Sequence, residues 1–238
     1  MTRTRGRRKH SIVPALLLSL IIIGVAIWAI FRFFVKQKYY TAKDFQIETV
    51  TSSVDYNDNG VDDYTDILLG ARIDAENHPT YDSAYYETGY PPDDIGVCTD
   101  VVWRAFKNAG YCLKDMVDRD IAAATSDYPD AAEPDPNIDF RRVRNLHVFW
   151  EKYAFSLTLD PEDIEQWQPG DIVIFGSDTH IGIISDKRNE AGLAYVIHNG
   201  GQSEREEDLF SRTEQEITGH YRFDASLVPE DVLVPWYD

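Results

Sequence analysis

Cys98 opens a stretch that reads as an amphipathic helix, a position where a thiol is readily activated. Apolar residues recur at helical spacing over residues 98–109, and Gly110 ends the pattern. Unpaired N–H groups and the helix dipole at a first turn favour the thiolate, which is the nucleophilic form. Cys112 lies beyond this helix, too distant for a disulfide if the helix is intact, and its apolar setting indicates a core residue. Taken alone, Cys98 could equally be a core residue.

Two histidines, His180 and His198, border a predicted pair of strands. Apolar runs at 181–184 and 195–197 flank a polar loop, which predicts an antiparallel hairpin. A hairpin symmetric about Asn189 pairs His180 directly with His198 on one face of the sheet. One imidazole can then act as a base toward a thiol while the other fixes its tautomer and orientation. Either histidine alone could instead be a structural residue bonded to the backbone.

Zinc is the competing use for Cys98, His180 and His198, because three protein ligands and one water form a reasonable catalytic site. Thiolate chemistry explains the same residues without an ion, so we predict no metal for catalysis. His147 and His220 have no comparable partner and are expected to be structural.

A segment before the first helix of the domain has the pattern of a calcium loop. It places oxygen-bearing side chains at alternate positions, a glycine at the sharp turn, and a backbone carbonyl after it, as a hard cation requires. The candidate ligands are Asp55, Asn57, Asn59, Val61, Asp63 and Asp66. The loop resembles those of EF-hand and dockerin-like modules, and its last ligand is Asp rather than Glu. We predict a structural Ca²⁺; a turn that only caps the next helix is the alternative.

Charge is divided very unevenly along the chain. The 238 residues include 23 Lys and Arg against 41 Asp and Glu, and this acidic excess argues against a nucleic-acid partner. Residues 1–38 nevertheless contain eight basic residues and no acidic one. The uncharged stretch at 12–31 is long enough to cross a bilayer, and the basic residues before it favour a cytoplasmic N-terminus. A single-pass anchor with the domain outside the cell is therefore predicted; a cleaved signal peptide is the alternative.

These features divide the chain into predicted segments. They are a cytoplasmic basic N-terminus (1–11), a transmembrane anchor (12–35), a stalk (36–54), a calcium-type loop (55–66), a cysteine-hydrolase-like domain (64–224) and a C-terminal tail (225–238).

Several motifs within residues 64–224 carry a family resemblance. They are GVCTDVVWRAF at 96–106, PDPNIDFRRV at 134–143, WQPGDIVIF at 167–175, THIGIISD at 179–186, HNGG at 198–201 and GHYRFD at 219–224. The cysteine, the Gln-Pro-Gly-Asp turn and the two histidines resemble the NlpC-like branch of papain-fold cysteine peptidases, which hydrolyse bacterial cell-wall peptides. The full set more closely resembles a bacterial family catalogued as a domain of unknown function.

The resemblance implies roles for particular residues. Cys98 would be the nucleophile, His180 the base and His198 the orienting residue, although Asn199 could take the third role instead. Arg141 and Arg142 lie in a segment similar to a family signature and could bind a substrate carboxylate. They could equally form a structural ion pair.

The resemblance, together with the anchor predicted from the apolar stretch, implies a fold and a function. The expected fold class is α+β with a papain-like, NlpC-like core, in which N-terminal helices pack on a small antiparallel sheet preceded by one transmembrane helix. The expected function is a membrane-anchored, extracytoplasmic thiol hydrolase that cleaves amide bonds of peptidoglycan stem peptides. Peptidoglycan or another cell-envelope peptide is the expected partner, with the membrane contacted through the N-terminal helix. The alternatives are a thioester-forming acyl or peptidyl transferase and a catalytically silent wall-binding or assembly module.

Overall fold

A computed structural model of the chain describes residues 21–25, 27–28 and 39–237. The helices of the folded unit are α2 (Asp63–Asn77), α3 (Cys98–Asn108), α4 (Leu113–Ala123) and α5 (Val143–Tyr153), with short 3-10 turns at Ala42–Phe45, Thr125–Asp127, Asp139–Arg141 and Ala225–Leu227. The strands are β1 (Thr80–Tyr81), β2 (Ile95–Gly96), β3 (Ala154–Ser156), β4 (Ile172–Phe175), β5 (His180–Arg188), β6 (Ala194–Ile197), β7 (Glu206–Glu207) and β8 (Ile217–Phe223).

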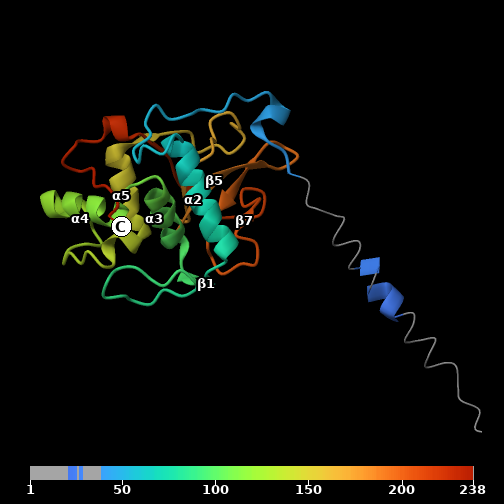
Figure 1. Ribbon diagram of the computed structural model, residues 1–238, viewed down its shortest axis with the longest axis horizontal. Coiled ribbons are helices and arrows are strands. Elements are labelled where there is room, and N and C mark those ends of the chain that lie inside the picture. The colour runs from blue at the N-terminus through green and yellow to red at the C-terminus, as the bar shows by residue number, and fades with distance from the viewer. Residues whose placement is uncertain (1–20, 26, 29–38, 238) are drawn as a thin grey trace, which may run out of the picture. The chain divides into compact units, whose positions relative to one another are not determined.

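The main sheet has the strand order β3-β8-β4-β5-β6-β7 in the described part of the chain, and each neighbouring pair is antiparallel. β1 and β2 form a separate parallel pair. The helices gather beside the sheet, with α2 and α3 next to β5 (Figure 1). The predicted α+β class with helices packed on an antiparallel sheet is therefore confirmed.

The hairpin of β5 and β6 differs in register from the predicted one. Ile183 pairs with Ile197, whereas the symmetric hairpin pairs Ile181 with Ile197. The predicted register is therefore wrong by two residues, and the pairing shifts again between Ile184 and Arg188, near the connecting loop. Because the shift is even, each side chain keeps its face of the sheet, so His180 and His198 still meet.

The helices and one face of the sheet enclose the larger core. Strand residues such as Ile174 and Ile181 pack there with the apolar side of α3, including Val102 and Phe106. Gly70 in α2 allows the two helices to approach, because a Cβ at this position would lie 2.5 Å from the Cβ of Asn108. This close packing fixes the helix that carries Cys98 against the sheet.

The opposite face of the sheet is buried by a smaller cluster. Val173, Phe175, Ile184 and Val196 pack there with Trp167. Both faces of the central strands are therefore covered, which explains why β4 and β5 read as continuous apolar runs rather than alternating ones.

The structure contradicts the predicted membrane anchor at residues 12–35 and the localisation based on it. In the residues that the structure describes, no helix has the length and apolar character needed to cross a bilayer. Positions 12–20 and 29–35 of the predicted anchor, and all of the predicted cytoplasmic segment, lie outside the described residues. The described positions 21–25 and 27–28 are helical and exposed. The predicted single-pass topology is therefore wrong.

The segment expected to be a stalk packs on the domain where it is described. The folded unit begins at Tyr39, and Tyr40 exchanges two backbone hydrogen bonds with Arg188 in β5 (2.8 and 2.7 Å). Ala42 and Ile47 are buried. Residues 39–54 are therefore part of the domain rather than a spacer.

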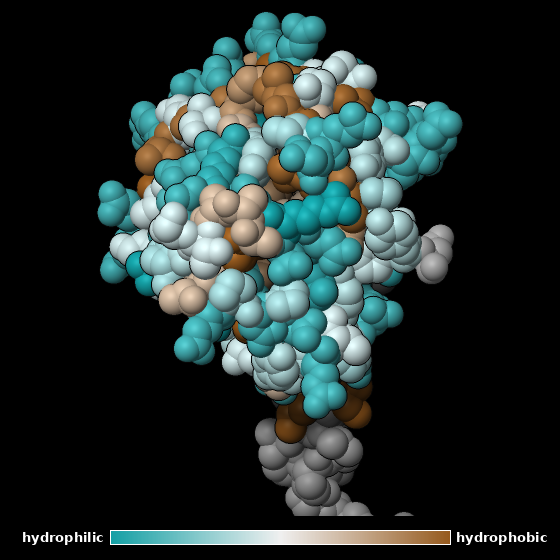
Figure 2. Space-filling model, turned by 90° about the vertical axis from the view of Figure 1, so that its left-hand side faces the viewer, coloured by the Kyte–Doolittle hydropathy of each residue, from teal (hydrophilic) through white to brown (hydrophobic). Residues whose placement is uncertain are grey.

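The expected C-terminal tail is also packed. The Cys112 N–H donates to the carbonyl of Val234 (2.8 Å), and Val232 and Val234 are both buried. The red segment in Figure 1 accordingly runs back along α4 and α5. On the face shown in Figure 2 the surface is mostly hydrophilic, and hydrophobic residues appear there in separate small groups.

Candidate active site

The chain that leads into Cys98 is fixed by hydrogen bonds from two directions. The Val97 N–H donates to the Asp100 carboxylate (2.8 Å), which caps the start of α3. The Asn199 amide donates to the carbonyl of Gly96 (2.9 Å) from the loop after β6. The loop that carries His198 is thereby tied to the backbone two residues before the nucleophile candidate.

The Cys98 sulfur lies against the start of β5. The residue is only 7% exposed, and the backbone N–H groups of Ile181 and Thr99 are close enough to favour the charged form of the sulfur. Burial raises the pKa of the Cys98 thiol to about 11, and these N–H groups oppose the shift only in part. The expectation that the first turn favours a thiolate is therefore wrong for the free protein. The thiol is neutral near pH 7 and needs a base.

His180 and His198 form a hydrogen-bonded pair next to this thiol. The Nε2 atom of His180 lies 2.8 Å from Nδ1 of His198, and the two rings are nearly perpendicular, at 86°. His180 directly precedes Ile181, whose N–H lies close to the Cys98 sulfur. Among the described residues no hydrogen bond joins the sulfur to either ring, and such contacts commonly tighten only when substrate binds. The structure thus brings Cys98, His180 and His198 into one region. Of the two histidines, His180 is the one adjacent in sequence to Ile181.

Gly182 makes room for this arrangement. A Cβ at Gly182 would lie 2.6 Å from a methyl carbon of Val196 and 3.2 Å from the Cβ of His198. A larger residue would therefore push β6 and its histidine away from β5.

Burial lowers the pKa of His180 to about 4, and the charge of His198 adds to the shift. The unfolded chain binds a proton at this histidine as pH falls through about 6.5, but the native protein does not until about pH 4. The contribution of neutral His180 to the free energy of unfolding is fully present above pH 6.5 and is lost as pH falls to 4. At neutral pH, His180 is a neutral imidazole and can accept a proton.

His180→Asn is expected to remove about 3 kcal/mol of the acid-induced loss of stability between pH 6.5 and 4. Urea unfolding at several pH values measures this difference from the wild type. His78→Asn is the matched control, because His78 is exposed. Equal pH dependence in the wild type and both variants would contradict the buried neutral imidazole.

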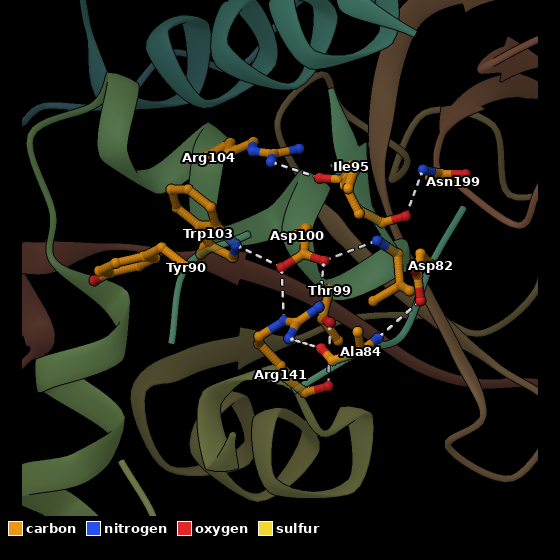
Figure 3. Close-up of polar contacts among 12 residues, drawn as sticks. Asp82, Ala84, Tyr90, Ile95, Thr99, Asp100, Trp103, Arg104, Arg141 and Asn199 are labelled. Carbon is orange, nitrogen blue, oxygen red and sulfur yellow. Dashed lines mark hydrogen bonds and ion pairs between the residues drawn. The ribbon is translucent and has the colours of Figure 1, made fainter. Parts of the chain in front are cut away.

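Arg141 does not face a substrate site. Its guanidinium makes a bidentate ion pair with Asp100 (2.8 and 2.9 Å), and both side chains are almost completely buried. The same carboxylate accepts from the indole of Trp103 (2.8 Å), while Arg141 also donates to the carbonyl of Ala84 (3.0 Å) (Figure 3). The predicted substrate-binding role of Arg141 is therefore corrected to the structural ion pair that the sequence also allowed.

Arg142 is also engaged, although it is more exposed. It pairs with Asp139 (2.9 Å) and donates to the backbone carbonyl of Asp130. These contacts brace the turn before α5, and they give Arg142 no position beside the Cys98 sulfur.

The Asn199 side chain is fully engaged in hydrogen bonds to the backbone. Its amide nitrogen donates to the carbonyls of Pro79 and Gly96, and its oxygen accepts from the Gly201 N–H (3.1 Å). Asn199 is completely buried. Its role is to hold the loop rather than to orient His180.

Three residues near the site had no signal in the sequence. Tyr81 in β1 pairs with Gly96, is 48% exposed, and lies close enough for the charge of Cys98 to contribute to its raised pKa. The amide nitrogen of Gln202 lies 3.1 Å from Nε2 of His198, and Glu207 approaches the same nitrogen at 3.3 Å. These side chains come from very short strands and a loop, so no periodicity marks them.

Side-chain hydrogen bonds within the predicted calcium loop connect its two ends. The amide nitrogens of Asn57 and Asn59 lie 3.0 and 2.8 Å from Oδ2 of Asp66, so three of the predicted ligands meet at one point. Asp63 instead turns into the core, where its Oδ2 accepts from the hydroxyl of Tyr111 (2.5 Å). Its Oδ1 accepts from the Tyr56 N–H (2.9 Å), so Asp63 contacts the loop backbone and the core rather than the other predicted side-chain ligands.

Within residues 21–25, 27–28 and 39–237, no three His, Cys, Asp or Glu side chains are grouped so that they could hold a metal ion. This finding covers Cys98, His180 and His198 as well as the carboxylates of the 55–66 loop.

Comparison with known proteins places the chain in a family. Residues 68–223 match the family model described as "Domain of unknown function (DUF1287)". The chain belongs to this family. The uncharacterized protein YijF of Escherichia coli (strain K12) is 36% identical over 169 residues, which cover 66% of this chain and 80% of YijF. No solved structure matches the chain. The matched range includes Cys98, His180 and His198, and the predicted membership of a bacterial family of unknown function is confirmed.

Proposed function

We propose that this domain is a thiol-dependent amide hydrolase with Cys98 as nucleophile, His180 as general base and His198 as the residue that orients His180. One observation carries the proposal. A hydrogen-bonded histidine pair lies at the start of β5, and the next backbone N–H of that strand is close enough to favour the charged form of a cysteine sulfur at a helix start. Nucleophile, base and orienting group are the parts that covalent acyl transfer needs.

The electrostatics favour proton transfer during attack over a preformed ion pair. The pKa of the Cys98 thiol is raised to about 11 and that of His180 is lowered to about 4, so both are neutral at rest. His180 takes the thiol proton as sulfur bonds to the amide carbonyl carbon. It then gives the proton to the leaving amine as the C–N bond breaks, and water cleaves the thioester to release the acid. Backbone N–H groups at the first turn of α3 are suited to stabilise the oxyanion.

The substrate class that we propose is the stem peptide of peptidoglycan. Support comes from the resemblance of the cysteine and histidine motifs to NlpC-like, papain-fold peptidases that hydrolyse bacterial cell-wall peptides. The α+β arrangement of helices on an antiparallel sheet is compatible with such a core.

The direct experiment incubates purified stem peptides of several compositions with the wild-type protein and with Cys98→Ala. Mass spectrometry should show a new amine and a new acid with the wild type and neither with the variant. Absence of cleavage of every peptide type by a folded wild-type protein would contradict hydrolysis.

Acyl or peptidyl transfer is the second candidate, and the burial of Cys98 favours it. A thioester formed on a residue that is 7% exposed is shielded from water and can await an amine. Adding an amine acceptor to the same peptides separates the two reactions, because transfer gives a joined product and hydrolysis gives a free acid.

We also propose that the loop at residues 55–66 binds a structural Ca²⁺. The convergence of Asn57 and Asn59 on Asp66 supports this, because it brings three of the predicted side-chain ligands of the loop together. Asp55, whose carboxylate accepts from the Gly60 N–H (2.8 Å), lies in the same loop. Asp63 is no longer part of the proposed ligand set, and Val61 would contribute its carbonyl.

Chelation of Ca²⁺ is expected to lower the melting temperature of the wild type, because an ion that binds only the native state stabilises it. Differential scanning calorimetry with and without chelator measures the change, and Asp66→Asn should abolish it. An identical melting temperature in both conditions would remove calcium from the account.

A further inference from the structure

We propose that Glu207 is a positioning residue that fixes the tautomer of His198 and, through it, leaves His180 with a free nitrogen for the thiol. This inference rests on the proposed function and extends the predicted set of cysteine and two histidines by a carboxylate.

Glu207 reaches the histidine pair from the neighbouring strand. It pairs with Val196 in β6, and its Oε1 lies 3.3 Å from Nε2 of His198. Both side chains are nearly buried, at 11% and 5% exposure. A hydrogen bond from His198 lowers the pKa of Glu207, so the group is a carboxylate at neutral pH and can only accept hydrogen bonds.

The proton positions follow from this contact. Because the Glu207 carboxylate can only accept, a single proton on the His198 ring is held at Nε2, and Nδ1 is left as an acceptor. Nδ1 lies 2.8 Å from Nε2 of His180, so Nε2 of His180 donates. The remaining nitrogen of His180, Nδ1, then has its lone pair free. That lone pair is what a general base toward Cys98 requires.

Gln202 cannot replace Glu207 in this role. Its oxygen accepts from the Gly200 N–H (2.7 Å), which fixes the amide with its nitrogen toward His198. That nitrogen donates to the carbonyl of His198 (3.0 Å) and lies at similar distances from both ring nitrogens, 3.2 and 3.1 Å. Because that nitrogen is almost equidistant from the two ring nitrogens, it is aligned with the lone pair of neither, and Gln202 offers Nε2 no acceptor.

Arg212 makes the proposal sharply testable. It donates to the second oxygen of Glu207, and its own side chain is 66% exposed. In Glu207→Gln the side chain has one amide oxygen and one NH₂ group, and one of them must face Arg212 while the other faces His198. Arg212 can only donate, so it takes the oxygen, and the NH₂ group turns toward Nε2 of His198. Nε2 must then accept, which moves the proton of His198 to Nδ1 and forces the proton of His180 onto the nitrogen needed by the thiol.

The double variant Glu207→Gln/Arg212→Ala predicts rescue. Without Arg212 the amide is free to turn its oxygen back to His198, and the original tautomer returns. Arg212→Ala alone is the matched control, because it removes an exposed side chain and leaves the carboxylate.

Two measurements on the full chain decide the matter without any substrate. Nitrogen-15 NMR of labelled histidines should find the proton of His198 on Nε2 in the wild type, on Nδ1 in Glu207→Gln and on Nε2 again in the double variant. The rate of Cys98 alkylation by iodoacetamide at pH 7 should fall about tenfold or more in Glu207→Gln and return to within about threefold of Arg212→Ala in the double variant.

A proton on Nδ1 of His198 in the wild type, or the same tautomer in the wild type and Glu207→Gln, would overturn the inference. An alkylation rate that the double variant does not restore would overturn it as well. Failure of the proposed function looks different. In that case stem peptides stay intact in the presence of the wild type, while the tautomer still follows the residue at position 207.

Discussion

Asp100→Ala is expected to lower the free energy of unfolding by about 3–5 kcal/mol. The substitution leaves the Arg141 guanidinium buried without its counter-ion, since that side chain is 2% exposed. It also removes the acceptor of the Val97 N–H and of the Trp103 indole. The loss of a buried charge partner dominates, because surface ion pairs contribute far less. Urea denaturation of the wild type and the variant measures the difference.

Asp115→Ala is the control for this experiment. Asp115 is the third residue of α4, as Asp100 is of α3, but its side chain is 41% exposed and its lysine partner lies 3.7 Å away. We expect this variant to lose about 1 kcal/mol or less. The double variant Asp100→Leu/Arg141→Met should recover much of the loss, since an apolar pair replaces the two charges. Equal effects of Asp100→Ala and Asp115→Ala would show that the buried ion pair does not hold the start of α3.

His180→Ala is expected to reduce the proposed amide hydrolysis by about a hundredfold to ten-thousandfold. The Cys98 thiol is neutral near pH 7 because burial raises its pKa to about 11, so attack depends on a neighbouring base. Initial rates of stem-peptide cleavage at pH 7 measure the effect.

His147→Ala serves as the control for this loss. His147 contacts Asp178 (2.7 Å) and lies outside the group of Cys98, His180 and His198, so its removal should change the rate by about twofold at most. Similar losses in the two variants would mean that the reduction reflects folding rather than a missing base.

The sequence was sufficient to predict the elements that carry the site. The apolar periodicity after Cys98 predicts α3, and the apolar runs beside His180 and His198 predict β5 and β6. The two histidines meet although the predicted register is wrong, because side-chain direction depends only on whether a shift is even or odd. A shift of one residue would have separated them.

The tertiary contacts that these elements make could not be predicted from the sequence. The effect of burial on Cys98 depends on the sheet that packs over it, so a local rule about helix dipoles gave the wrong protonation state. Arg141 pairs with Asp100 across a gap of 41 positions along the chain, and no spacing rule marks such a pair. Glu207 lies in a strand of two residues, too short for any pattern. Tertiary contacts of this kind decide which charged groups remain free for chemistry.

The most direct test of the account compares the alkylation of two cysteines in the same folded protein. Cys98 and Cys112 have similar exposed fractions, 7% and 5%, and Cys112 also lines a surface cavity, so faster modification of Cys98 would not reflect easier access to that sulfur. We expect iodoacetamide at pH 7 to modify Cys98 at least about tenfold faster than Cys112, and His180→Ala to remove most of that advantage. Equal rates in the wild type, or a Cys98 rate that does not depend on His180, would contradict a catalytic thiol and leave a catalytically silent module with the same fold.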